Sequence, residues 1–190
     1  MAVNNLTNHH RPPIIGAWVD QGIGCNGAYQ SMKQRFEELS SLIEKWYYFV
    51  TPAEFYEFLD DKPKTQIFLI MSGQAGQQIV PARHTYENIH SMYIYCGNVN
   101  EHRRLKEECD KVKDVMNLED DVYERIADEL SRLLLNIGES YVRSQDRGLA
   151  RNYLTEALRL MKTILRYNNN HGRVIQVNDL LESIDTSIEP

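Results

Sequence analysis

TQIFLIM, residues 65–71, is the most apolar short segment of the chain and predicts the central strand of a β-sheet. Four further short segments have the apolar, aromatic and β-branched character of strands: IIGAWV (14–19), WYYFV (46–50), SMYIYC (91–96) and KDVMNL (113–118). Helical segments separate them, so the order of elements is βαβαβαβαβ. This alternation is typical of a parallel sheet with right-handed crossovers and helices on both faces.

The segments between these strands carry helical signals. Residues 28–43 have apolar side chains at spacings of three and four, as on an amphipathic helix. Thr51, Pro52 and Glu54 form a capping-box pattern, which predicts a helix start directly after the second strand. SGQAGQQ predicts a loop that leads into a helix reaching about Asn88, and residues 99–112 predict a surface helix.

The pattern changes after residue 118. Residues 118–145 and 149–167 are two long amphipathic helices separated by DRG, which predicts an antiparallel helical hairpin. We therefore expect an α/β fold with a five-stranded, mostly parallel, receiver- or flavodoxin-like sheet, followed by this hairpin. The predicted organisation is a mobile tail (1–12), an α/β domain (13–118), the hairpin (119–167), and a linker with a short terminal helix (168–190).

The composition narrows the classes of function. The 190 residues include 42% hydrophobic and 25% charged residues, with a net charge of −6, so the chain lacks the basic character of nucleic-acid binders. No apolar run approaches the ~20 residues that cross a bilayer, and the first residues lack the apolar core of a signal peptide. The three cysteines are widely spaced, which favours free thiols in the cytoplasm.

Ligands of open α/β sheets bind outside the carboxyl ends of the strands. The candidate ligand-binding residues at this rim are Asp20, Gly22, Gly24, Gly27, Ser72, Gly73, Gly76 and Asn98.

The first glycine group, Gly22, Gly24 and Gly27, has the G-x-G-x-x-G spacing of a dinucleotide-binding turn. Asp20 and Gln21 separate it from the strand and place a carboxylate where a pyrophosphate would bind. The second strand also ends without a free acid for a ribose. A glycine-rich loop without a ligand is the favoured interpretation, and a dinucleotide or another anion is the alternative.

The second group, Ser72, Gly73 and Gly76, is the better anion cradle because it follows the central strand and precedes a helix. It lacks the lysine of a P-loop, so nucleotide hydrolysis is not expected. A tight crossover that needs small residues is the structural alternative.

No complete catalytic or metal-binding set is present. Asp20 occupies the position of a receiver-domain acid, but Met71 and Ser72 stand where such a domain needs its phosphoacceptor Asp, so a capping role is favoured. Cys96 has no histidine at the rim beside it, which favours a structural thiol over a nucleophile. The histidines share no ligand spacing. We therefore predict no catalytic residues, no metal and no cofactor.

The segments IIGAWVDQ, TQIFLIMSGQAGQQIVPARH and SMYIYC, within residues 14–126, resemble a receiver-like α/β domain of large animal multidomain proteins. In those proteins the domain precedes arginine-specific ADP-ribosyltransferase domains or tetratricopeptide repeats. The resemblance implies a non-catalytic accessory module. YLTEALRLM, in the second helix of the predicted hairpin, resembles tetratricopeptide helices in texture.

These observations lead to three hypotheses. The first is a non-enzymatic interaction or regulatory module of a larger signalling or effector protein, which binds a protein partner or itself through its C-terminal helices. The second is a sensor of a nucleotide or NAD-derived anion at the rim. The third is a hydrolase that uses Cys96.

Overall fold

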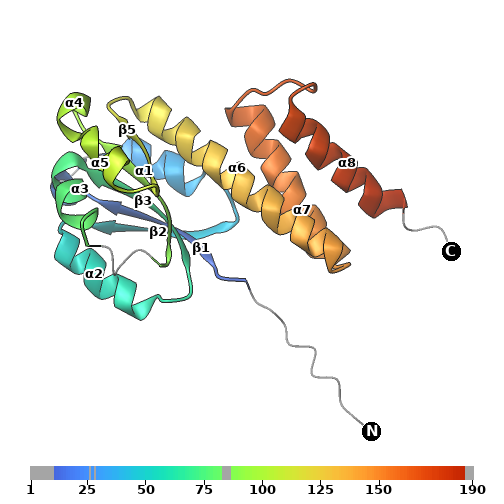
Figure 1. Cartoon of the computed structure of the whole chain (residues 1–190), viewed down its shortest axis with the longest axis horizontal. Helices are drawn as coiled ribbons and strands as arrows, with labels where there is room; N and C mark the ends of the chain where they lie inside the picture. Colours follow the sequence, from blue (N-terminus) through green and yellow to red (C-terminus); the bar gives the residue numbers. More distant parts are fainter. Residues whose placement is uncertain (1–10, 26, 28, 83–86, 187–190) are drawn as a thin grey trace, which may run out of the picture.

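The computed structural model describes residues 11–25, 27, 29–82 and 87–186. Its centre is a parallel five-stranded sheet with the order β2-β1-β3-β4-β5 (Figure 1). The strands are β1 (Ile14–Val19), β2 (Ile43–Phe49), β3 (Gln66–Ser72), β4 (Ile89–Tyr95) and β5 (Val112–Met116). The predicted fold class is therefore confirmed, with β3 at the centre of the sheet.

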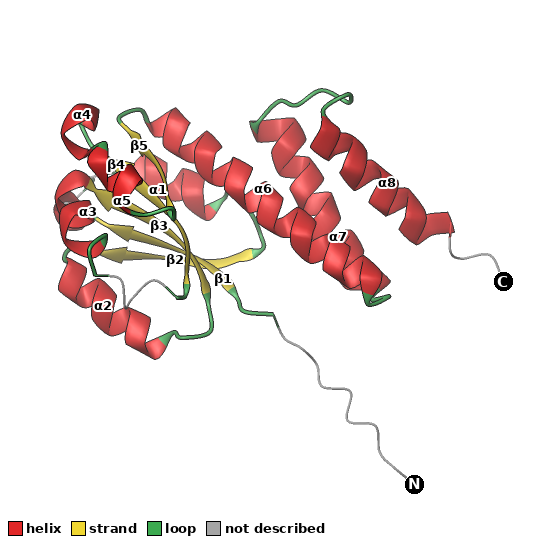
Figure 2. Cartoon of the chain, in the orientation of Figure 1, coloured by secondary structure: helices red, strands yellow, loops and turns green. Residues whose placement is uncertain are grey.

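Helices cover both faces of the sheet (Figure 2). They are the 3-10 helix η1 (Gln21–Gly24), α1 (Gln30–Glu37), α2 (Pro52–Asp61), α3 (Gly73–Ile79), α4 (Val99–His102), α5 (Arg104–Glu108), α6 (Glu119–Arg143), α7 (Arg147–Arg159), the π-helical turn η3 (Leu160–Ile164) and α8 (Gly172–Thr186). Among the described residues, no helix is both long and apolar enough to span a membrane.

Side-chain alternation along the buried strands builds two hydrophobic cores. Trp18, Phe68 and Tyr93 face α1 and α6, whereas their neighbours in the strands face α2, α3 and α5. This division follows from right-handed crossovers, because the chain reverses direction across the sheet after β2.

The core on the α1 and α6 side continues into the C-terminal helices. One continuous cluster joins Trp18 and Phe36 to Leu134, Leu154 and Val177. α7 lies on the side of α6 away from the strands, and α8 packs against α7 (Figure 1). The predicted hairpin is thus confirmed as α6 and α7, and α8 is a third helix of 15 residues packed on it.

Two local predictions were wrong. The helix predicted for 28–43 ends at Glu37, because Ser40 forms a turn in which its Oγ and carbonyl oxygen accept the N–H groups of Leu42 and Ile43. The loop predicted for SGQAGQQ is helix α3, since Ser72 caps it by accepting the Ala75 N–H.

Smaller corrections concern other element bounds. α3 ends at Ile79 instead of near Asn88, and residues 83–86 lie outside the described part. The surface helix predicted for 99–112 is two short helices, α4 and α5, which meet at Arg103. Most of the tail predicted to be mobile, residues 1–10, lies outside the described residues.

Candidate functional site

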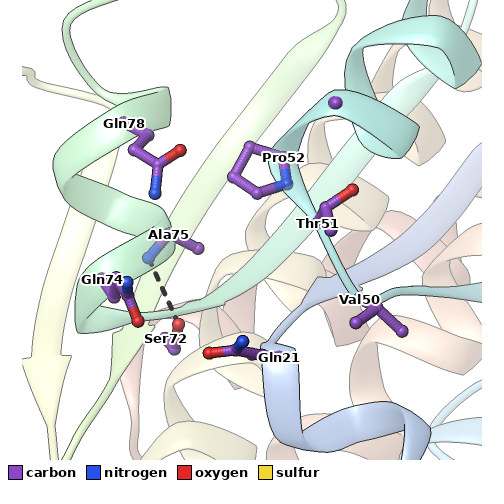
Figure 3. Close-up of a pocket in the computed structure, with 9 residues that line it drawn as sticks. Gln21, Val50, Thr51, Pro52, Ser72, Gln74, Ala75 and Gln78 are labelled. Carbon is purple, nitrogen blue, oxygen red and sulfur yellow. Dashed lines mark hydrogen bonds between the residues drawn. The ribbon is translucent and has the colours of Figure 1, made fainter.

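A cavity of about 300 Å³ lies at the carboxyl edge of the sheet, where β1 and β3 are neighbours (Figure 3). The chain leaves β1 toward α1 on one face and leaves β3 toward α3 on the other. This is the switch point at which open α/β sheets bind ligands. The cavity is lined by Gln21, Val50, Thr51, Pro52, Ala53, Ser72, Gln74, Ala75 and Gln78.

The lining combines small apolar groups with three carboxamides. Gln78 extends from α3 toward Pro52 of α2, and Gln21 lies beside Ser72 at the other end of the cavity (Figure 3). The hydroxyls of Thr51 and Ser72 cap the two helices by accepting backbone N–H groups. None of the lining side chains titrates, so the chemistry of the cavity is neutral and polar.

Asp20 is buried beside the cavity but does not line it. Its Oδ1 accepts the Gly22 N–H at 2.7 Å, and its Oδ2 accepts the Tyr29 hydroxyl at 3.4 Å. Burial, together with the Asp20 carboxylate, raises the pKa of Tyr29. Asp20 therefore has the geometry of a cap for η1, and it occupies the Gly22 N–H that an anion would need.

The other glycines of this group also lie outside the cavity lining. A Cβ atom on Gly24 would lie 3.0 Å from the Val50 side chain. Gly27 has a φ of +78°, a conformation that favours glycine, although a Cβ atom there would meet no other described atom within 4 Å. Their spacing fits a tight turn between β1 and α1.

Only Ser72 of the second glycine group lines the cavity. A Cβ atom on Gly73 would lie 2.2 Å from the His102 ring, and one on Gly76 would lie 3.2 Å from Leu105. Both glycines thus permit close packing of α3 against α4 and α5.

Asn98 caps α4 and does not line this cavity. Its Oδ1 accepts the Glu101 N–H, and its Nδ2 donates to the Glu101 carboxylate at 3.1 Å. The structure therefore does not bring the eight predicted ligand-binding residues together. Each has a local structural role, and one of them reaches the cavity.

Cys96 has the environment of an unreactive thiol. Burial raises its pKa, and its Sγ points to the Asn98 carbonyl oxygen at 3.5 Å. His90 lies at the opposite end of β4, where its ring packs at a tilt against the Phe68 ring with 4.9 Å between the ring centroids, and burial lowers the pKa of His90. His84 lies outside the described residues. Within the described part of the chain, no group of three or more His, Cys, Asp or Glu side chains could hold a metal ion.

Sequence reasoning did not find the most connected polar cluster, which lies between α6 and α8. The Asp128 carboxylate accepts hydrogen bonds from Arg173, from the Tyr167 hydroxyl at 3.2 Å and from Arg132 at 3.2 Å. Arg173 also donates to the Ser131 hydroxyl. The sequence did contain a signal for this cluster: Asp128 is an acid on the buried face of a predicted helix, and Arg132 follows it one turn later.

The charges in this cluster have a defined electrostatic consequence. Burial raises the pKa of Asp128, but the hydrogen bond and charge of Arg173, together with Arg132, outweigh it, so the pKa lies below its ordinary value. The ionised pair therefore stabilises the packing of α8 on α6.

No family model matches the chain, and no curated protein or solved structure matches it either. The resemblance of residues 14–126 to receiver-like accessory domains therefore stays a prediction.

Proposed function

We propose that this chain is a non-enzymatic interaction or regulatory module whose C-terminal helices contact a protein partner or a second copy. The observation that carries the proposal is the structural use of the reactive groups at the strand rim. Asp20, Ser72 and Asn98 cap helices, and the Cys96 thiol has a raised pKa. The side chains that a catalytic site at this rim would use are therefore occupied by hydrogen bonds within the fold or, for Cys96, held in the protonated form.

The second support is the layer of α7, η3 and α8, which we call the outer helices. α1 and α6 together cover one face of the sheet. The outer helices are therefore an addition to a sheet whose two faces are already covered. The addition is firmly held by the shared core and by the Asp128–Arg173 pair. A rigid helical surface is a common platform for protein recognition.

The outer helices also expose large apolar side chains. Leu149 on α7 is 40% exposed, and Ile175 on α8 is 44% exposed. Such side chains are candidates for a contact, because a partner that covers them removes apolar surface from water.

The proposal includes a cytoplasmic setting. Cys25, Cys96 and Cys109 are free thiols, and we place the module in the cytoplasm, where thiols stay reduced. The resemblance of residues 14–126 favours an accessory role within a larger signalling or effector protein.

The test compares Leu149→Asp and Ile175→Asp with the matched control Val50→Asp, which changes an equally exposed apolar residue at the rim. Light scattering at increasing concentration measures self-association, and quantitative proximity labelling in cells measures partner contact. We expect both helical variants to weaken association or labelling and the control to keep it. Unchanged association and labelling in both helical variants would contradict the proposal.

A further inference from the structure

We propose that the cavity at the switch point is a binding site for an uncharged amide group. The site goes beyond the proposed interaction function, because its lining comes from η1, α2, α3 and the loops before them, with no residue of the C-terminal helices. The ligand chemistry is that of a primary or secondary carboxamide next to a small apolar body.

The position and size of the cavity fit a small group. Three consecutive crossover loops supply the walls, and the volume of about 300 Å³ lies at the lower end of the range for ligand pockets. Val50, Pro52, Ala53 and Ala75 supply an apolar surface against which a small ring or aliphatic group can pack.

The polar groups of the lining favour an amide. The side chains of Gln21, Gln74 and Gln78 are exposed at the mouth of the cavity, and their amides make no hydrogen bond to another described residue, so they are free to exchange water for a ligand. Each carboxamide offers two N–H donors and an acceptor oxygen, so it pairs with the N–H and C=O groups of another amide. The oxygens of Thr51 and Ser72 already accept capping hydrogen bonds, which leaves recognition mainly to the glutamines.

The surrounding charges disfavour an ionised ligand. No titratable side chain lines the cavity, so an ion that loses water there finds no counter-charge. The carboxylates of Asp20 and Glu54 flank the lining in sequence and are held by backbone N–H groups, Glu54 through Val50 at 2.9 Å. Both carboxylates oppose an anion. The nucleotide-sensor hypothesis predicts instead that an anion binds at this site more tightly than an uncharged amide.

The probes for the test are benzamide, benzoate and benzylammonium, which share one ring and differ in charge. Each is titrated into the full chain while backbone amide signals are followed by ¹H–¹⁵N correlation spectroscopy. We expect benzamide to give saturable shifts centred on Gln21, Ser72 and Ala75, and benzoate and benzylammonium to bind at least about tenfold more weakly.

Variants locate the binding within the cavity. Gln74→Ala combined with Gln78→Ala is expected to weaken benzamide at least about fivefold. Gln77→Ala, on the same helix but directed to His102, is the matched control and is expected to keep wild-type affinity. Unshifted signals from the sheet in each variant show that the fold is intact.

A further probe, the capped peptide acetyl-Ala-Gln-Ala-amide, tests whether the amide belongs to a protein segment or to a small molecule. Tighter binding of the peptide than of benzamide supports an amide from a protein segment, and the reverse order supports a small molecule. The proposal is overturned if benzoate or benzylammonium binds as tightly as benzamide, if benzamide gives no saturable shift up to about 20 mM, or if the double variant binds like wild type. None of these outcomes depends on the association of the outer helices.

Discussion

Asp20 at the strand rim and Asp128 between the C-terminal helices are equally buried, with 8% of each residue exposed. Within the described part of the chain, Asp20 accepts hydrogen bonds only from uncharged groups within nine residues of it. Asp128 accepts from Arg173, 45 residues away, and from two further side chains. Asp20, at the edge where a ligand was expected, therefore caps a neighbouring turn. Asp128, which the sequence did not single out, connects two helices that are far apart in the chain.

The largest expected effect comes from removing the long-range partner of Asp128. Arg173→Ala leaves a buried carboxylate without its closest cation, and we expect it to lower the free energy of unfolding by about 3 kcal/mol. Urea denaturation measures this. Arg132→Ala is the control: its side chain is half exposed and also pairs with Asp128, so we expect a loss of less than about 1 kcal/mol. Equal losses in the two variants would show that Arg173 has no special role.

The next effect tests whether the rim glycines serve packing. Gly73→Ala places a Cβ atom against the His102 ring, and we expect a loss of about 2 kcal/mol in unfolding free energy. His102→Ala removes the obstacle, so the double variant is expected to lose less than the sum of the single losses. Strict additivity would contradict the packing role of Gly73.

A smaller effect is expected at Asp20. Asp20→Ala removes the cap of η1 and is expected to cost about 1 kcal/mol, whereas Asp20→Asn keeps an acceptor oxygen and is expected to change stability by a few tenths. Thermal unfolding distinguishes them. If Asp20→Asn were as destabilising as Asp20→Ala, the negative charge of Asp20, and not its capping oxygen, would be what matters.

The smallest expected effect is a difference in pH dependence. Because the pKa of Asp128 is lowered in the folded state, its stabilising contribution is present above the unfolded pKa of about 4 and is lost as pH falls through the folded pKa. The stability gap between wild type and Asp128→Asn is therefore expected to narrow below about pH 4. Denaturation at several pH values measures the gap, and a gap that widens in acid would contradict this assignment.

The sequence predicted the sheet well because its strands are short apolar runs buried on both faces, as in TQIFLIM. The Thr51 cap was also predicted, since all its parts lie within four residues, and the structure confirms it. The start of α3 was not predicted, because the glycines in SGQAGQQ are typical of a loop. The helix is favoured there by the Ser72 cap and by the packing of Gly73 against His102, which depends on tertiary structure.

The candidate site was less predictable than the fold. The cavity combines Gln21, Val50 and Gln78 from three separate crossovers, and no local pattern marks their meeting. The G-x-G-x-x-G spacing indicated a possible ligand at Gly22, but the Gly22 N–H already donates a hydrogen bond to Asp20. The Asp128–Arg173 pair depends on how α8 folds back on α6, which periodicity alone does not specify.

Because the C-terminal helices and the sheet share one hydrophobic core, we expect them to unfold as one cooperative unit. Both tryptophans, Trp18 and Trp46, lie in the sheet, whereas α6, α7 and α8 contribute much of the helical circular dichroism. Urea unfolding followed by tryptophan fluorescence and by far-ultraviolet circular dichroism separates the two regions. We predict one coincident transition for both signals. A helical transition at lower urea than the fluorescence transition would contradict the claim.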